Sequence, residues 1–146
     1  MEHIRKAVPA DLCRIAEIEI FNYRLNFYPI FRSDEFYFGE LQVTSLMERY
    51  AADPGGSYVY DDGVVKGFVR LDGAEIKKLF VEPVLQGQRI GAALLKHAVH
   101  QGASSLWALE KNIRAIRFYE RHGFRLTGER KPEEGTSEYL VKMILP

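Results

Sequence analysis

Apolar residues recur three and four positions apart in four stretches of the chain, the spacing of an amphipathic helix. The first stretch follows Pro9-Ala10-Asp11, a typical helix start, and the second ends at Asp53-Pro54-Gly55-Gly56. The pattern therefore predicts about four helices. They cover residues 12–20, from Asp34 or Gly39 to Tyr50, 89–102 and 112–122.

Shorter stretches rich in valine, isoleucine and aromatic residues predict seven strands. Asp61-Asp62-Gly63 and Asp72-Gly73 supply the glycines of tight hairpins, so the three strands around them should form an antiparallel meander. Later strands alternate with helices, which implies crossovers and a partly parallel sheet. No repeat or linker interrupts the series, so residues 1–146 are expected to form a single domain. The predicted strands cover residues 4–8, 57–60, 64–71, 75–81, 105–109, 124–129 and 138–144.

The segment between the first two helices is unusually aromatic. Pro29 and Arg32-Ser33-Asp34-Glu35 interrupt it, which predicts a helix end, a bend and the start of the next helix. So many rings cannot all point inward on two short helices, so some should surround a ligand or form a dimer contact. The aromatic residues are Phe21, Tyr23, Phe27, Tyr28, Phe31, Phe36, Tyr37 and Phe38.

Composition narrows the classes of protein. The 146 residues include 20 basic and 20 acidic side chains, so no global charge attracts nucleic acid or an anionic membrane. Cys13 is the only cysteine, which excludes an internal disulfide, and it is expected to be a small core residue rather than a nucleophile. The charged start and the lack of a long apolar run predict a soluble, cytoplasmic protein without a secretory signal.

The segment Gln86-Gly87-Gln88-Arg89-Ile90-Gly91-Ala92 joins the third strand of the meander to the third helix and predicts a phosphate site. The unpaired amides and dipole of a helix start attract anions, and glycine lets them approach the backbone. A tight packing turn would use the same glycines. A P-loop would need Lys and then Ser or Thr where Ala92-Ala93 stands, and the Gly-x-Gly-x-x-Gly of a dinucleotide site is absent.

A second motif runs from Asn112 to Phe124. Asn112 stands at a helix start, Phe118-Tyr119 follows two turns later, and Gly123 lies just beyond the helix. Each of these residues also has an ordinary role, as an N-cap, as core aromatics or as a C-cap.

Together the two motifs resemble those of the GNAT superfamily of N-acetyltransferases. Leu79-Phe80-Val81-Glu82-Pro83 and the turn that follows are similar to its strand, x-Pro, Gln/Arg-x-x-Gly-x-Gly/Ala segment, and residues 112–124 to its Asn-x-x-Ala-x-x-Phe-Tyr-x-x-x-Gly-Phe segment. The resemblance implies an α/β fold: a mixed, mostly antiparallel seven-stranded sheet, about four flanking helices, and parallel fourth and fifth strands that splay apart. It implies a coenzyme A site made of Leu79, Phe80, Val81, Gln86, Gly87, Gln88, Arg89, Ile90, Gly91, Ala92, Asn112, Ala115 and Phe118.

The resemblance also implies catalytic roles. Tyr119 matches the tyrosine that protonates the departing thiolate, and Asn112 matches a residue that contacts the pantetheine arm. A backbone amide of residues 79–81 would donate to the oxyanion. Arg89 stands where the family usually has its first glycine, and its side chain would either crowd the phosphates or donate its guanidinium to them.

The remaining roles concern the acceptor amine. Glu75 or Glu110 would remove its proton through a water, although each could be only a solvated carboxylate at a strand end. In the family the first two helices line the acceptor site, so aromatic residues should surround the amine, with Asp34 or Glu35 attracting its charge. The predicted acceptor residues are Tyr23, Phe27, Tyr28, Phe31, Asp34, Glu35 and Tyr37.

These features predict an enzyme that moves an acetyl group directly from acetyl-CoA to a primary amine of a small molecule, peptide or protein, as a monomer or homodimer. One alternative is a regulatory module that binds acyl-CoA without catalysis, and another is a protein-interaction domain. His97 and His100 lie three residues apart without a third ligand, so no metal is assigned and both are expected to face solvent.

Overall fold

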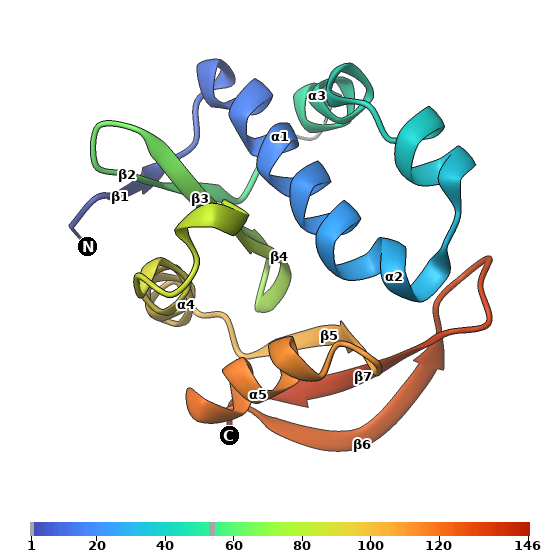
Figure 1. The fold of residues 1–146 in the computed structure, drawn as a ribbon. Coiled ribbons are helices and arrows are strands. Elements are labelled where there is room, and N and C mark those ends of the chain that lie inside the picture. Colours follow the sequence, from blue (N-terminus) through green and yellow to red (C-terminus); the bar gives the residue numbers. More distant parts are fainter. Residues whose placement is uncertain (1, 53–54) are drawn as a thin grey trace.

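The seven predicted strands form one sheet. The computed structural model describes residues 2–52 and 55–146, and its strands lie in the order β1-β2-β3-β4-β5-β7-β6 (Figure 1). β4 and β5 run parallel, and the other neighbouring strands are antiparallel. The predicted mixed, mostly antiparallel sheet is therefore confirmed. The strands are β1 Ile4–Lys6, β2 Ser57–Asp61, β3 Val65–Asp72, β4 Glu75–Val81, β5 Ser105–Leu109, β6 Arg125–Pro132 and β7 Tyr139–Ile144.

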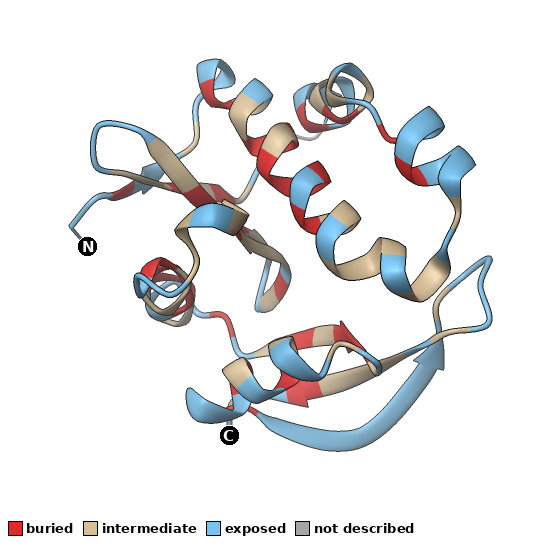
Figure 2. Cartoon of the chain, in the orientation of Figure 1, coloured by how far each residue is buried: buried red, intermediate tan, exposed pale blue. Residues whose placement is uncertain are grey.

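Helices cover both faces of this sheet. On one face, α1 (Leu12–Asn22) and α3 (Val43–Ala52) pack around Phe68 of β3, and on the other, α4 (Ile90–His100) and α5 (Ile113–Arg121) pack around Leu106 of β5. Each fully buried Leu, Ile or Phe contributes about 1.5–3 kcal/mol, so these two clusters hold the layers together. Figure 2 shows buried residues concentrated in α1, α4 and the inner strands, whereas β6 is exposed along its length. None of the described helices has the length and apolar character of a membrane-spanning segment.

The predicted helix end, bend and start of the next helix are confirmed, but the bend lies beyond Pro29: the chain stays helical from Leu12 to Phe31, and the next helical segment begins at Glu35. α1 passes into a π-helical turn, η2 (Tyr23–Phe27), and then into α2 (Tyr28–Phe31). The wider π turn lies directly before Pro29, where a continuous α-helix would press a carbonyl against the proline ring. The helix ends only at Arg32, whose φ of 55° is left-handed. The rod therefore reaches as far as the loop between β6 and β7 (Figure 1).

The second predicted helix is also divided. A π-helical segment, η3 (Glu35–Glu40), precedes α3, and Leu41 between them has an extended backbone. A short 3-10 turn, η1 (Pro9–Asp11), leads into α1, and another, η4 (Pro83–Leu85), follows β4. The turn predicted at residues 53–56 begins with residues 53 and 54, which lie outside the described residues.

A bulge in β4 shapes the centre of the sheet. The register of β4 against β3 shifts between Arg70 and Leu71, so Lys77 is an extra residue in β4. The extra residue reverses the facing of the strand: Ile76 packs in the α4–α5 cluster, whereas Phe80 packs against the α1–α3 cluster. Regular alternation would have placed both on one face.

β4 and β5 diverge soon after they meet. They pair only at Glu75–Ser105 and Ile76–Leu106, and β5 then continues beside β7 up to Leu109. The predicted splay of the two parallel strands is therefore confirmed, and it leaves one edge of β4 without a partner strand beyond Ile76.

Two predictions about single residues are corrected. Cys13 is exposed, because α1 turns Ile15 and Ile18 toward the sheet instead. His97 is only 8% exposed, and its ring centroid lies 4.5 Å from that of Tyr58. The spacing of apolar residues in α4 cannot show that β2 covers this side of the helix.

Candidate active site

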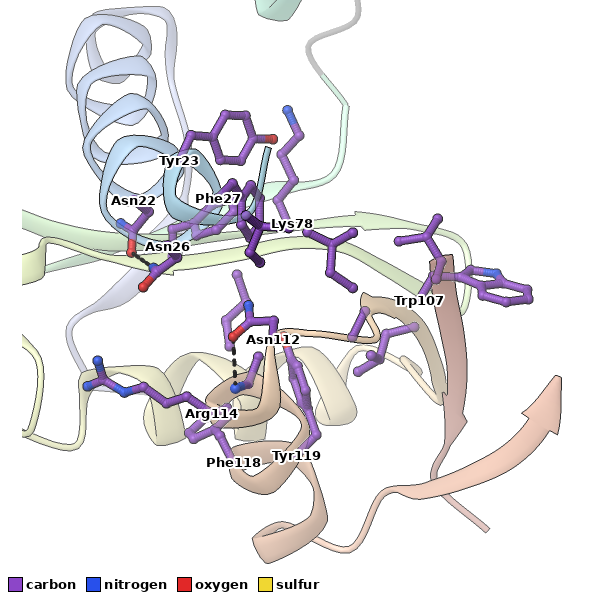
Figure 3. A pocket seen from close by; sticks show the side chains of 18 of the residues that line it. Asn22, Tyr23, Asn26, Phe27, Lys78, Trp107, Asn112, Arg114, Phe118 and Tyr119 are labelled. Carbon is purple, nitrogen blue, oxygen red and sulfur yellow. Dashed lines mark hydrogen bonds between the residues drawn. The ribbon is translucent and has the colours of Figure 1, made fainter. Parts of the chain in front are cut away.

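The divergence of β4 and β5 opens a cavity of about 1340 Å³. The volume exceeds the roughly 300–1,000 Å³ of an ordinary small-molecule pocket, so the cavity can hold a long ligand together with a second one. Figure 3 shows Tyr23 and Phe27 on one side of the opening and Asn112 and Tyr119 on the other. The loop between β6 and β7 lines one end of the cavity.

The unpaired edge of β4 forms part of the cavity wall. Leu79, Phe80 and Val81 line the cavity, and no residue of β5 pairs with this part of the strand. Main-chain donors and acceptors need partners, so this edge can bind an extended ligand much as it would bind another strand.

A row of free main-chain amides lies beside it, at the start of α4. The amides of residues 87–92 donate none of the hydrogen bonds found among the described residues; the first amide of α4 to do so is that of Ala93, which donates to the carbonyl of Arg89 at 3.1 Å. Six consecutive N–H groups at a helix N-terminus, where the dipole is positive, make an anion site.

Backbone conformation explains this row. Gly87 has a φ of 87°, a conformation that glycine adopts without strain, and Arg89 has a φ of 65°, which is uncommon for a residue with a side chain. Gly91 is not required for packing, since a Cβ there would lie 3.5 Å from Phe118 in ordinary contact. Its lack of a side chain instead leaves the helix start uncovered. A tight packing turn therefore does not account for Gly91.

A buried asparagine ties this turn to α1. The Asn22 side chain is 2% exposed and donates to the carbonyls of Ile18 and Val81, each at 2.9 Å. Its Oδ1 accepts a hydrogen bond from Gln86 Nε2 at 3.2 Å. Gln86 is predicted to bind the coenzyme, but its side chain has a structural role here. It links α1 and the end of β4 to the turn before α4.

The α5 side of the cavity contains the predicted acid. Asn112 caps α5, its Oδ1 accepting from the amide of Ala115 at 3.3 Å. Tyr119 is 9% exposed, and burial raises the pKa of its phenol. No described residue hydrogen-bonds the phenol. Its oxygen is nevertheless not a buried atom without a partner, because His97 Nε2 is the one such side-chain atom among the described residues. The Tyr119 hydroxyl therefore reaches the open space of the cavity.

A buried cluster of polar and charged side chains joins α1 to β4 and α3. Glu19 is 1% exposed, and its two carboxylate oxygens accept hydrogen bonds from Lys78 Nζ at 2.9 and 2.8 Å and one from the Tyr50 hydroxyl. Burial is the main cause that raises the pKa of the Tyr50 phenol, and the negative charge of Glu19 raises it further. Tyr50 therefore stays protonated. The β4 bulge turns Lys78 toward α1, so the bulge and this ion pair depend on one another.

Charged side chains that have no ionic partner in the described part of the chain lie at two ends of the cavity. Arg89, Arg114 and Arg121 line one end, and none of them has an ionic partner among the described residues. Glu133 and Glu134 line the other end, in the loop between β6 and β7. The cavity can therefore bind an anion at one end and a cation at the other.

Most of the predicted coenzyme and catalytic residues meet at this cavity. Three of them, Gln88, Glu75 and Glu110, do not line it. Glu75 pairs with Lys77 at 2.8 Å, and Glu110 pairs with Arg130 at 2.9 Å. The predicted coenzyme and catalytic residues that line the cavity are Leu79, Phe80, Val81, Gln86, Gly87, Arg89, Ile90, Gly91, Ala92, Asn112, Ala115, Phe118 and Tyr119.

The predicted acceptor residues divide in the same way. Tyr23, Phe27, Phe31 and Tyr37 line the cavity. Tyr28, Asp34 and Glu35 do not, and the Tyr28 hydroxyl donates to Asp34. Within the helical rod of residues 12–31, Tyr23, Phe27 and Phe31 lie four residues apart on one side, whereas Tyr28 is turned to another side.

Sequence reasoning missed several residues that line the cavity. Asn22 and Asn26 are polar residues inside an aromatic segment, and this interruption was the available signal. Lys78 belongs to a Lys-Lys doublet that breaks strand alternation, which is the signature of the bulge. Glu133 carries no local signal, since only the fold brings its loop to the aromatic helix.

Known proteins share this fold. The solution structure of apo-form YjaB from Escherichia coli matches with a TM-score of 0.77 at 22% identity, covering 97% of this chain and 95% of that one. The PaiA N-acetyltransferase of Thermoplasma acidophilum, solved with coenzyme A, matches with a TM-score of 0.67 at 19% identity, covering 95% and 96%.

Sequence comparison agrees with the fold. Peptidyl-lysine N-acetyltransferase YjaB of Salmonella typhimurium is 32% identical over 90 residues, which are 60% of this chain and 62% of that protein. The chain therefore matches less than two thirds of the length of this curated relative. The family model described as "Acetyltransferase (GNAT) domain" matches residues 53–126, half of the chain. With the splayed strands and the free amides at the start of α4, this match shows that the chain belongs to the GNAT acetyltransferase family.

Proposed function

We propose that this protein is an N-acetyltransferase that moves an acetyl group directly from acetyl-CoA to a primary amine. The observation that carries the proposal is the row of six free amides, residues 87–92, all but one of which (Gln88) belong to residues that line the cavity. Such a row binds a diphosphate, and coenzyme A has a diphosphate in the middle of its length. The names of the relatives, one a peptidyl-lysine N-acetyltransferase and one solved with coenzyme A, support the same chemistry.

The rest of the cavity suits the remaining parts of acetyl-CoA, the donor substrate. The free edge of β4 offers main-chain groups to the amides of the pantetheine arm, and Asn112 keeps its side-chain NH2 group available for the same arm. Arg89, Arg114 and Arg121 add positive charge at the diphosphate end. These residues hold the donor, while main-chain amides of β4 are the proposed donors to the oxyanion that forms on its carbonyl oxygen.

Transfer requires a proton for the departing thiolate. The acceptor attacks as a neutral amine, after its ammonium has lost a proton to water. As the nitrogen forms its bond to the carbonyl carbon, the carbon–sulfur bond breaks and sulfur takes a proton, while the nitrogen releases a second proton to water and the acid is later reprotonated from water. Tyr119 is the proposed acid, because burial raises its pKa and keeps the phenol protonated at neutral pH. Cys13, the only cysteine, does not line the cavity, which supports direct transfer over an acyl-cysteine intermediate.

The test combines binding with turnover. Titration calorimetry should show that coenzyme A and acetyl-CoA bind the purified protein, and a panel of primary amines should then release free thiol from acetyl-CoA. Binding without thiol release from any amine, peptide or protein acceptor would favour a regulatory acyl-CoA module. Absence of binding by either coenzyme form would overturn the proposal.

A further inference from the structure

The wall of the cavity opposite α5 is aromatic. Tyr23 stacks on Phe27 with ring centroids 5.0 Å apart, and the Tyr37 ring lies 4.9 Å from that of Phe36 and 6.5 Å from that of Phe31. These side chains come from η2, α2 and η3 and all line the cavity. Faces of aromatic rings bind both an apolar stem and a cation.

The loop between β6 and β7 closes this end of the cavity. It begins directly after Pro132, the last residue of β6, which pairs with Tyr139 of β7. Three hydrogen bonds hold the backbone of Glu133: its amide donates to the carbonyl of Glu138 at 2.8 Å, and its carbonyl accepts from the amide and the hydroxyl of Thr136. Glu133 therefore stands at the fixed base of the loop, whereas Glu134 is exposed at its tip.

The carboxylate of Glu133 has no cation of its own. It is half-buried and lines the cavity, but it forms no ion pair or side-chain hydrogen bond with the described residues. The two lysines that line the cavity already have anionic partners, since Lys78 pairs with Glu19 and Lys77 with Glu75. A partly desolvated carboxylate without a partner favours the arrival of a cation.

The charge of Glu133 acts on two phenols of the aromatic wall. Burial and then nearby charge raise the pKa of both Tyr23 and Tyr37, and Glu133 is among the groups acting on each. Both phenols therefore stay neutral at physiological pH and add no charge of their own. Glu133 and the aromatic wall thus act on the same part of the cavity.

We propose that Glu133 binds the ammonium group of the acceptor, and that the acceptor is an alkylammonium whose apolar stem lies along the aromatic wall. A lysine side chain has this chemistry: four methylene groups that end in a primary ammonium. The inference rests on the proposed acetyl transfer, and it assigns to one residue the choice of acceptor. Glu133 replaces Asp34 and Glu35 in this role, since neither of these residues lines the cavity.

The kinetic test compares Glu133→Gln with Glu35→Gln, which makes the same change of charge at an exposed residue that does not line the cavity. With Nα-acetyl-lysine amide as acceptor, Glu133→Gln should lower kcat/KM by roughly 10- to 100-fold, the effect of losing one charged hydrogen bond, and mainly through KM. Glu35→Gln should stay within about threefold of the unmodified protein. Equal effects of the two variants would overturn the inference while leaving the proposed transfer intact.

A binding test separates the two proposals. NMR titration of the coenzyme A complex should show that n-butylammonium binds more tightly than neutral n-pentanol, and that Glu133→Gln removes this preference while coenzyme A affinity is unchanged. Equal binding of the two probes to the unmodified protein would overturn the inference. Loss of thiol release from every amine, with the preference for n-butylammonium intact, would instead overturn the proposed transfer and leave the cation site standing.

Discussion

The two halves of the cavity are built from different parts of the polypeptide. The half between β4 and α4 presents main-chain groups, namely the free edge of β4 and the amides of residues 87–92. The half between the aromatic helix and the β6–β7 loop presents side chains, among them Tyr23, Tyr37 and Glu133. Main-chain groups are the same in every sequence, so a fold can keep one donor substrate while side chains opposite it choose different acceptors.

The largest expected effect tests the ion pair that joins the two halves. Lys78→Met leaves the Glu19 carboxylate, which is 1% exposed, without its cation, and an uncompensated buried charge costs about 3–5 kcal/mol. Urea unfolding should show a loss of this size. The double variant Glu19→Gln with Lys78→Met should regain most of it, because no charge is then buried. A loss below about 1 kcal/mol for Lys78→Met alone would contradict this account.

The next effect separates chemistry from binding on the coenzyme half. Tyr119→Phe removes the phenolic proton but keeps the ring that packs against Phe124, so turnover should fall about 100-fold or more while coenzyme A affinity stays nearly unchanged. Steady-state kinetics and calorimetry measure the two quantities. Tyr28→Phe, which lies outside the cavity, is the matched control and should retain turnover. Unchanged turnover in Tyr119→Phe would remove Tyr119 from proton transfer.

A smaller effect tests whether a side chain assists the main-chain half. Arg89→Gly removes an exposed guanidinium at the end of the cavity that the arginines line. Coenzyme A affinity should fall about three- to fivefold at low salt, and the difference should shrink as salt is added. Folding stability should not fall, because glycine accepts the φ of 65° without strain. Gln88→Gly, in the same turn but outside the cavity, should leave affinity unchanged. Tighter binding by Arg89→Gly would show that the side chain crowds the phosphates.

The smallest effect lies outside both halves. Burial lowers the pKa of His97 below its usual 6.5, so the unfolded chain takes up a proton at a higher pH than the folded protein does. Stability from this source is present above pH 6.5 and is lost as the pH falls from there through the folded pKa. His97→Phe, which keeps a ring beside Tyr58, should flatten urea-unfolding stability between pH 7 and pH 5. An unchanged slope would assign the pH dependence to other groups.

Local pattern was enough to predict the strands, the antiparallel meander and the turn before α4. The reason is that hairpin glycines, strand alternation and helix caps act over a few residues, so their signals survive in the linear sequence. The GNAT-like motifs at residues 79–92 and 112–124 lie in the same range, and nearly all of the coenzyme residues inferred from them line the cavity.

The sequence by itself thus predicted the sheet, its splay and most of the residues that line the β4–α4 half of the cavity, whereas only the tertiary structure decided the half between the aromatic helix and the β6–β7 loop. The continuous rod through Pro29 depends on a π turn, the partner of Lys78 lies 59 residues away at Glu19, and Glu133 reaches the aromatic wall across the whole fold. The last two of these features are side-chain contacts between segments that are far apart in the sequence. Such contacts are set by the packing of the helices on the sheet, which no short stretch of sequence encodes.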